Sequence, residues 1–246
     1  MDAVLALPGL PWLLLAALTC GVVYGFAGFG TALIFIPVAA AILGPEGAVA
    51  ALAVMGLGSV VTMLPRAWAQ ADKRTTLLMV GAATVTMPAG IWMLAHVDPT
   101  PLRWAMCLLI AGTLVATVAG WTIRLGAGMG PRLGVGAVAG VLGGATGLLG
   151  PVVIVTALAS GDRAVRMRAN LASFLTILNA ALLPMLWVQG VLDRTALVAG
   201  AVLIGPYVGG TMIGMALFRP GAERVYRGIA YAVVGAAVVA GLPLLD

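Results

Sequence analysis

Apolar residues form long runs along this chain, and polar residues gather in short stretches between them. The runs cover approximately residues 10–43, 47–65, 75–95, 101–123, 133–159, 167–189, 195–217 and 225–244. A helix needs about 20 apolar residues to cross a bilayer, and six of the runs fit that length. The pattern predicts an all-α integral membrane protein that forms a single transmembrane domain over residues 1–246.

Two of the runs are interrupted by glycine. The run 10–43 is too long for one crossing and short for two, and its centre reads GFAGFGT from Gly25 to Thr31. The run 133–159 contains GGATGLLGP from Gly143 to Pro151. Clustered glycine and proline break helices, so each run is expected to be two half-helices around a non-helical centre. Because the arms of 133–159 would have only about 13 residues each, re-entrant hairpins are favoured over full crossings.

Composition agrees with this class. Apolar residues make up 62% of the 246 residues and charged residues only 9%, whereas a soluble domain has about 25% charged residues. The net charge of +5 comes from single basic residues or small groups between apolar runs, which is typical of topology signals. A nucleic-acid partner is therefore not expected; the expected surroundings are a lipid bilayer.

The basic residues also test the hairpins. If both broken runs return to the side they entered from, eleven of the 13 lysines and arginines share one side, and only Arg103 and Arg194 lie on the other. Such a bias follows the positive-inside rule. It predicts a multi-pass protein of the plasma (inner) membrane, with both termini on the outer side and loops 66–74, 124–132, 160–168 and 219–227 inside.

The order of motifs repeats along the chain. A glycine break, an Asp-basic-Thr turn, a Pro-containing span and a Pro-x-x-x-Arg motif occur in the same order in residues 10–123 and 133–244. Each half would then be one Gly-broken hairpin plus three transmembrane helices. Three is odd, so the second half enters from the opposite face, which is an inverted repeat of the kind found in secondary transporters.

These motifs resemble those of the sulfite exporter TauE/SafE family of membrane permeases. The matching stretches are GFAGFGTALIFIP from Gly25 to Pro37 and GVLGGATGLLGPVVIV from Gly140 to Val155. Thr31 and Ala32 stand where the family often has glycine. The resemblance implies a permease that exports or imports a small anion, such as sulfite, an organosulfonate or a related oxyanion. Export is the expected direction, because an anion leaves a cell with a negative interior downhill.

The breaks themselves favour an anion on physical grounds. A helix that begins inside the membrane presents free N–H groups and about half a positive charge. Glycine allows a ligand to approach the backbone, and threonine adds a hydroxyl donor. The candidate substrate-binding residues at the breaks are Gly28, Gly30, Thr31, Thr146, Gly147 and Gly150. The alternative is a channel-like or structural membrane protein whose glycines serve helix packing only.

A polar stripe in the run 167–189 adds further candidates. Asn170, Ser173, Thr176 and Asn179 recur every three residues, and asparagine is costly against lipid. Asn170, Ser173 and Asn179 are proposed as substrate contacts, with hydrogen bonding between helices as an equal alternative. Ser59 is a loose counterpart in the first half, and core packing is the preferred role for Tyr24 and Tyr207.

The remaining chemistry argues against an enzyme. All eight acidic residues lie at the ends of runs or near the termini, so no carboxylate relay crosses the membrane. The sequence has no Ser-His-Asp set, no HExxH motif and no metal cluster. No catalytic residue, metal or cofactor is expected, and a homodimer is left open as the oligomeric state.

Overall fold

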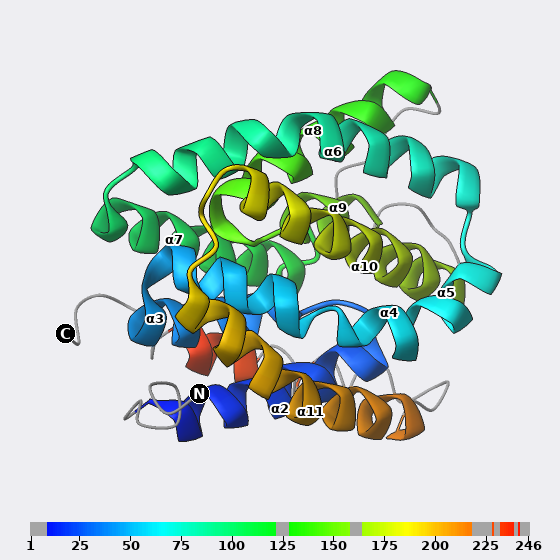
Figure 1. Cartoon of the computed structure of the whole chain (residues 1–246). Coiled ribbons are helices and arrows are strands. Elements are labelled where there is room, and N and C mark those ends of the chain that lie inside the picture. The colour runs from blue at the N-terminus through cyan, green and yellow to red at the C-terminus, as the bar shows by residue number, and fades with distance from the viewer. Residues whose placement is uncertain are drawn as a thin grey trace.

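The computed structural model describes residues 9–121, 128–157, 164–217, 228, 232–238 and 241. Over these residues the chain forms helices and no strand (Figure 1). Six of the helices are long and apolar enough to cross a membrane. The helices are α2 (Leu10–Ala27), α3 (Thr31–Met55), α4 (Gly58–Thr62), α5 (Leu64–Gln70), α6 (Lys73–His96), α7 (Pro99–Val118), α8 (Met129–Thr146), α9 (Pro151–Ala157), α10 (Ala164–Val188) and α11 (Arg194–Leu217).

Helices α2 and α11 are far apart in the sequence, yet they lie side by side over most of their length (Figure 1). Glycines make this possible: a Cβ on Gly21 would collide with the carbonyl oxygen of Tyr207, and one on Gly25 with that of Thr211. The contact positions advance together along both helices, so the two helices are parallel. Small residues that let two backbones approach are the usual device of helix packing in membranes.

Helices α6 and α8 form a second pair of the same kind along the opposite side of the bundle (Figure 1). A Cβ on Gly136 would collide with the carbonyl oxygen of Met79, and one on Gly140 with that of Ala83. These positions also advance together, so α6 and α8 are parallel. In each pair, the helix that precedes a glycine break in one half of the chain packs on a helix from the other half.

Helix α3 contains a sharp bend. Gly44 has φ 74° and ψ 168°, which is not helical, and Pro45 follows it. The backbone at Gly44 lies in the left-handed region of φ that only glycine adopts easily. The bend separates a short arm over residues 31–43 from a second stretch that continues through α4 and α5. It falls where the sequence predicts a boundary, between the runs 10–43 and 47–65.

The first arm of the second broken run is longer than the sequence suggests. Helices α2 and α8 have 18 residues each, because α8 begins at Met129. At 1.5 Å per residue an 18-residue arm reaches about 27 Å, close to the roughly 30 Å hydrocarbon core of a bilayer. The expectation of about 13 residues for the first arm of 133–159 is therefore wrong. Of the second arm, the structure describes the seven residues of α9.

One end of the bundle gathers several helix ends. The Asp72 N–H donates to Oδ1 of Asn170 at 2.7 Å, and the Arg132 guanidinium donates to the Thr75 hydroxyl at 2.7 Å. The starts of α6, α8 and α10 therefore meet there. This basic end holds Arg66, Lys73, Arg74, Arg132, Arg166 and Arg168.

The opposite end of the bundle carries few basic residues. Arg103 lies near the start of α7, directly after α6 has run the length of the bundle, and Arg194 begins α11. The division among these residues agrees with the predicted charge bias. Several parts of that prediction lie outside the described residues: Arg124, Arg163, Arg219, Arg224, Arg227, both chain termini and most of the run 225–244.

Candidate functional site

The first glycine break ends α2 and begins α3. Gly28 has φ 77°, and its N–H donates to the carbonyl of Tyr24. Gly30 has φ 105° and is the N-cap of α3, without a side-chain cap. Both values lie in the left-handed region that favours glycine. Because α3 starts here, the first three amides of the helix, at residues 31–33, have no acceptor within the helix.

The second break repeats the turn that ends α8. Gly147 has φ 72°, and its N–H donates to the carbonyl of Gly143. The Thr146 hydroxyl donates to the carbonyl of Leu142 at 2.6 Å and accepts from the Leu148 amide at 3.3 Å. Thr146 therefore stabilises the turn. Helix α9 begins with Pro151, which has no N–H to donate.

The two breaks meet at an internal cavity of about 50 Å³. A water-sized sphere needs roughly 10–15 Å³ in such a volume, so the cavity holds about three to five atoms of that size. Helices α2, α3, α4, α9, α10 and α11 contribute to the wall, together with the second break. The lining residues are Tyr24, Gly30, Thr31, Ala32, Leu33, Leu52, Gly56, Ser59, Gly147, Leu148, Leu149, Gly150, Pro151, Ile154, Leu175, Thr176, Asn179 and Tyr207.

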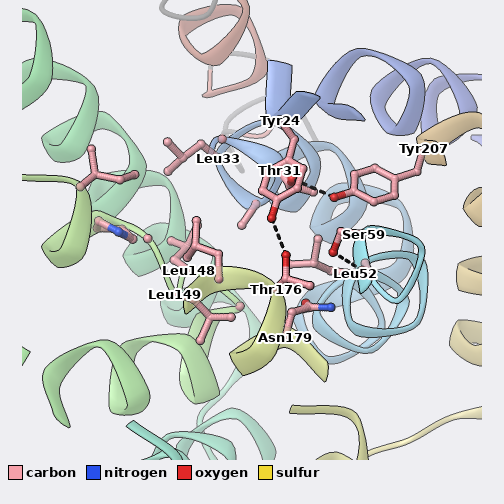
Figure 2. A pocket seen from close by; sticks show the side chains of 18 residues that line it. Tyr24, Thr31, Leu33, Leu52, Ser59, Leu148, Leu149, Thr176, Asn179 and Tyr207 are labelled. Atoms are coloured by element: carbon pink, nitrogen blue, oxygen red, sulfur yellow. Dashed lines mark hydrogen bonds between the residues drawn. The ribbon is translucent and has the colours of Figure 1, made fainter. Parts of the chain in front are cut away.

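Hydroxyl groups form one wall of this cavity. The hydroxyls of Tyr24 and Thr176 lie 2.6 Å apart, and the Tyr24 hydroxyl also lies 3.2 Å from the carbonyl oxygen of Ala172. The hydroxyls of Thr31 and Tyr207 lie 3.5 Å apart. Figure 2 shows these four side chains converging, with Leu148 and Leu149 on another side of the cavity. The cavity thus has a polar wall of neutral donors and an apolar wall.

Two further polar side chains are partly committed to the backbone. The Ser59 hydroxyl donates to the carbonyl of Gly56 at 2.6 Å, and the Asn179 amide nitrogen donates to the carbonyl of Ala53 at 3.1 Å. The Asn179 amide carries two N–H groups, so this bond leaves the second N–H and the amide oxygen uncommitted. These bonds hold both side chains in place at the point where α3 gives way to α4.

No charged side chain of the described residues lines the cavity. The positive potential in it comes from the backbone, because residues 30–33 at the start of α3 form part of its wall and a helix N-terminus carries about half a positive charge. Arg168 lies just outside, where its guanidinium donates to the carbonyl of Gly25 in the last turn of α2. A neutral donor set beside a helix N-terminus suits an anion.

The comparison with protein families agrees with this geometry. Residues 13–241 match the model of the sulfite exporter TauE/SafE family. The chain belongs to that family. Neither the curated proteins nor the solved structures contain a significant match.

Membership of the TauE/SafE family makes the chain a membrane transporter of sulfite-type anions. The cavity lies at the two glycine motifs that carry the resemblance to TauE/SafE proteins in the sequence. The stretches that carry the resemblance thus contribute residues to this cavity.

The structure brings five of the nine candidate residues of this TauE/SafE protein to the cavity: Gly30, Thr31, Gly147, Gly150 and Asn179. The other four lie elsewhere. Gly28 forms the turn beside Arg168, and Thr146 stabilises the second turn. Asn170 accepts a hydrogen bond from Asp72 at the basic end. Ser173 is completely buried, and its hydroxyl has no hydrogen-bond partner among the described residues.

Four polar residues of the cavity are missing from the candidates chosen from the sequence: Tyr24, Ser59, Thr176 and Tyr207. Core packing was the expected role of both tyrosines, and they are indeed buried, but their hydroxyls reach the cavity. Thr176 belongs to the same polar stripe as Asn179, so the stripe itself was a usable signal. Nothing in the sequence shows that Tyr207 approaches the first break.

Proposed function

We propose that this TauE/SafE protein is a secondary transporter that exports a small oxyanion, with sulfite as the best candidate, and that the anion binds in the cavity between the two breaks. The observation that carries the proposal is the donor set of the cavity. It combines the free amides at the start of α3 with the hydroxyls of Tyr24, Thr31, Thr176 and Tyr207. An oxyanion can accept hydrogen bonds from the free amides directly. Each hydroxyl has one proton, and that of Tyr24 is donated to the carbonyl of Ala172 in this structure, so the hydroxyls bind the anion by turning from their present acceptors.

The size of the cavity supports a small substrate. About three to five water-sized atoms fit in 50 Å³, and sulfite has four non-hydrogen atoms. An organosulfonate such as taurine has seven, so it would need the cavity to widen. We therefore rank sulfite and similar oxyanions above organosulfonates.

Two glycines of the breaks, Gly30 and Gly150, differ in surroundings from the glycines that pack helices, and this argues against the channel-like or structural alternative. A Cβ on Gly30 would meet only a side-chain carbon of Val23, at 3.0 Å, and one on Gly150 would first meet Ile154, at 3.1 Å. The glycines at the helix crossings, such as Gly25 and Gly140, instead face backbone carbonyls of a neighbouring helix. Gly30 and Gly150 therefore leave space beside the cavity rather than bring two helices together.

The arrangement of the halves supports an inverted repeat over residues 10–123 and 133–244. The two breaks share a left-handed glycine, φ 77° at Gly28 and φ 72° at Gly147, that ends an 18-residue helix. The helices before the breaks pack in the same parallel manner, α2 on α11 and α8 on α6. Two equivalent breaks that face one cavity are the plan of a binding site at a repeat interface.

The basic end of the bundle supports an orientation in the plasma membrane. Arg66, Lys73, Arg74, Arg132, Arg166 and Arg168 lie at that end, and the positive-inside rule then places it in the cytoplasm. Helix α2 runs toward the basic end, parallel to α11, which places the start of α2 outside. Both termini are proposed to be outside.

The membrane potential supports outward movement. Moving one charge through 100 mV is worth about 2.3 kcal/mol, and a cell interior is negative, so an anion leaves downhill. No carboxylate of the described residues lines the cavity to carry a coupled proton. We propose electrogenic export driven by the potential.

Flux into and out of proteoliposomes tests this function. Sulfite efflux is expected to rise when valinomycin and potassium impose an inside-negative potential, and sulfite is expected to outcompete taurine. If flux does not change with the potential but does change with a pH or sodium gradient, transport is coupled to protons or sodium and is not driven by the potential alone. Absence of any sulfite flux or binding would overturn the proposal.

A further inference from the structure

A second cavity lies at the basic end of the bundle. It has a volume of about 100 Å³ and is bounded by α5, α10 and the end of α11. Its polar lining comes from Arg66, Gln70 and Arg168, and the sulfur of Met215 is among its apolar groups. We refer to this cavity as the basic vestibule. Two guanidiniums in one cavity contrast with the cavity between the breaks, where the described lining residues carry no charge.

Arg168 connects the basic vestibule to the first break. Its guanidinium donates to the carbonyl of Gly25, and its side chain passes directly over Gly28. A Cβ on Gly28 would lie 2.7 Å from Cγ of Arg168 and 3.0 Å from its carbonyl oxygen. The absence of a side chain at Gly28 is therefore what lets Arg168 occupy this place.

The same face of α10 leads on to the cavity between the breaks. Ala172 lies one turn after Arg168, and its carbonyl oxygen lies 3.2 Å from the Tyr24 hydroxyl. Thr176 lies one turn further and lines that cavity. Eight residues at 1.5 Å each separate the two levels by about 12 Å along the helix. Arg168 thus stands between the basic vestibule and the site of the proposed function.

The chemistry of the basic vestibule suits an anion with several oxygens. A guanidinium presents a planar fork of N–H donors that binds such oxygens in pairs. The Arg66 guanidinium lies 3.9 Å from the sulfur of Met215, and no carboxylate of the described residues pairs with it. Clefts lined by charge of one sign concentrate ions of the opposite sign.

We propose that the basic vestibule is a loading site for the transported anion, which binds between Arg66 and Arg168 before it passes Gly28 to the cavity between the breaks. This inference rests on the proposed function and adds to it a separate, charged binding site on one face. Arg66 supplies charge and one donor fork. Arg168 supplies the second donor fork. It lies beside the first break, where it also donates to the carbonyl of Gly25.

The alternative is that these arginines only set the orientation of the protein in the membrane through their positive charge. This alternative predicts different effects of substitution. Arg74 lies at the same end of the bundle, is exposed and does not line the basic vestibule. If the arginines acted only through the overall surface charge, removal of Arg74 and of Arg66 would have the same effect. Arg74→Gln is therefore a matched control for Arg66→Gln.

The test measures sulfite flux in both directions through vesicles with one orientation of insertion. Arg66→Gln is expected to raise KM for sulfite presented at the basic face by about three- to tenfold, the range for a charged hydrogen bond that is partly screened. The maximal rate from the basic face and the KM at the opposite face are expected to stay as in the wild type. Because a mutation cannot change the equilibrium of transport, Vmax/KM must fall by the same factor in both directions, so the maximal rate from the opposite face is expected to fall about three- to tenfold. Arg74→Gln is expected to leave both KM values unchanged.

Arg168 is tested with the substitution Arg168→Lys, which keeps the charge and a donor for the carbonyl of Gly25 but removes the planar fork. It too is expected to raise KM at the basic face only. The loading site is overturned if Arg66→Gln changes KM no more than Arg74→Gln, or if KM rises equally at both faces. A wild-type protein that neither binds nor transports sulfite would instead overturn the proposed function itself, independently of the variants.

Discussion

Thr31→Val removes one hydroxyl from the cavity while keeping the shape of the side chain. Thr31 is the first residue of α3, and its hydroxyl lies 3.5 Å from that of Tyr207, a long and weak hydrogen bond. In the proposed site, the Thr31 hydroxyl donates a hydrogen bond to the bound anion. A hydrogen bond to a charged group contributes about 1.5–3 kcal/mol, so the dissociation constant for sulfite is expected to rise about tenfold to 150-fold.

The stability of the empty protein separates binding from folding in this variant. Because the bond to Tyr207 is weak, Thr31→Val is expected to cost at most about 1 kcal/mol of unfolding free energy. Thr113→Val is the matched control, since the Thr113 hydroxyl donates to the carbonyl of Leu109 at 2.6 Å within α7, and Thr113 does not line the cavity.

Calorimetric titration measures the dissociation constant for sulfite in Thr31→Val, Thr113→Val and the wild type, and thermal unfolding measures how much sulfite stabilises each of them. A ligand at 100 times its dissociation constant stabilises a protein by about 2.7 kcal/mol. At the same concentration, a hundredfold weaker variant would keep about 0.4 kcal/mol of that stabilisation. The reasoning is refuted if Thr31→Val binds sulfite as tightly as Thr113→Val and the wild type.

Three further predictions follow from other residues. Ser173→Ala is expected to keep transport and to leave stability unchanged or raise it by about 1 kcal/mol, because the buried hydroxyl has no partner; lost flux with intact folding would make Ser173 a ligand contact. Gly147→Leu is expected to abolish flux, because a side chain there would press on Ile36 and Val49 of α3 beside the cavity and strain a residue at φ 72°; normal flux in the folded variant would show that the second break takes no part. Hydrogen bonds from Thr75 hold the pKa of the Asp72 carboxylate below its usual range. The ionised carboxylate therefore stabilises the fold above the pKa it has in the unfolded chain, and this stabilisation is lost as the pH falls through the lower pKa of the folded state. Asp72→Asn should weaken the acid sensitivity of Tm by the equivalent of at most about 0.5 kcal/mol, since the group is exposed, and an unchanged pH profile would contradict the assignment.

The sequence allowed the backbone of the two breaks to be predicted, because the constraint there is local. Gly28, Gly30 and Gly147 adopt left-handed φ values, and no non-glycine residue that the structure describes does so. The boundary near Gly44 was visible for the same reason, as a glycine followed by proline. The lengths of the helices are harder to predict from the sequence. Helix α8 begins at Met129 and includes Gly130 and Pro131, whereas the apolar run begins only at residue 133.

The polar stripe of α10 could be found in the sequence, but its spacing did not show which of its residues line the cavity. A spacing of three residues turns about 300° around a helix of 3.6 residues per turn, so the stripe drifts by about 60° per step. Asn170 and Asn179, nine residues apart, therefore point to nearly opposite sides. Thr176 and Asn179 differ by one step, and both line the cavity. Which face meets the cavity depends on the neighbouring helices.

The tyrosines could not be placed from the sequence for a different reason. Tyr24 and Tyr207 come from α2 and α11, and their ring centroids lie 6.2 Å apart. Their approach depends on the close packing of these two helices, which the crossing glycines Gly21 and Gly25 permit. A contact between residues so distant in the chain follows from tertiary structure alone.

The position of a bound anion tests the central claim most directly. Selenite has the shape and charge of sulfite, and selenium scatters X-rays anomalously, so crystals of the protein grown with selenite would locate the ion. The account predicts an anomalous peak between Thr31 and the second break, within hydrogen-bonding distance of the amides that begin α3. A folded protein with selenite bound elsewhere and none in this cavity would contradict it.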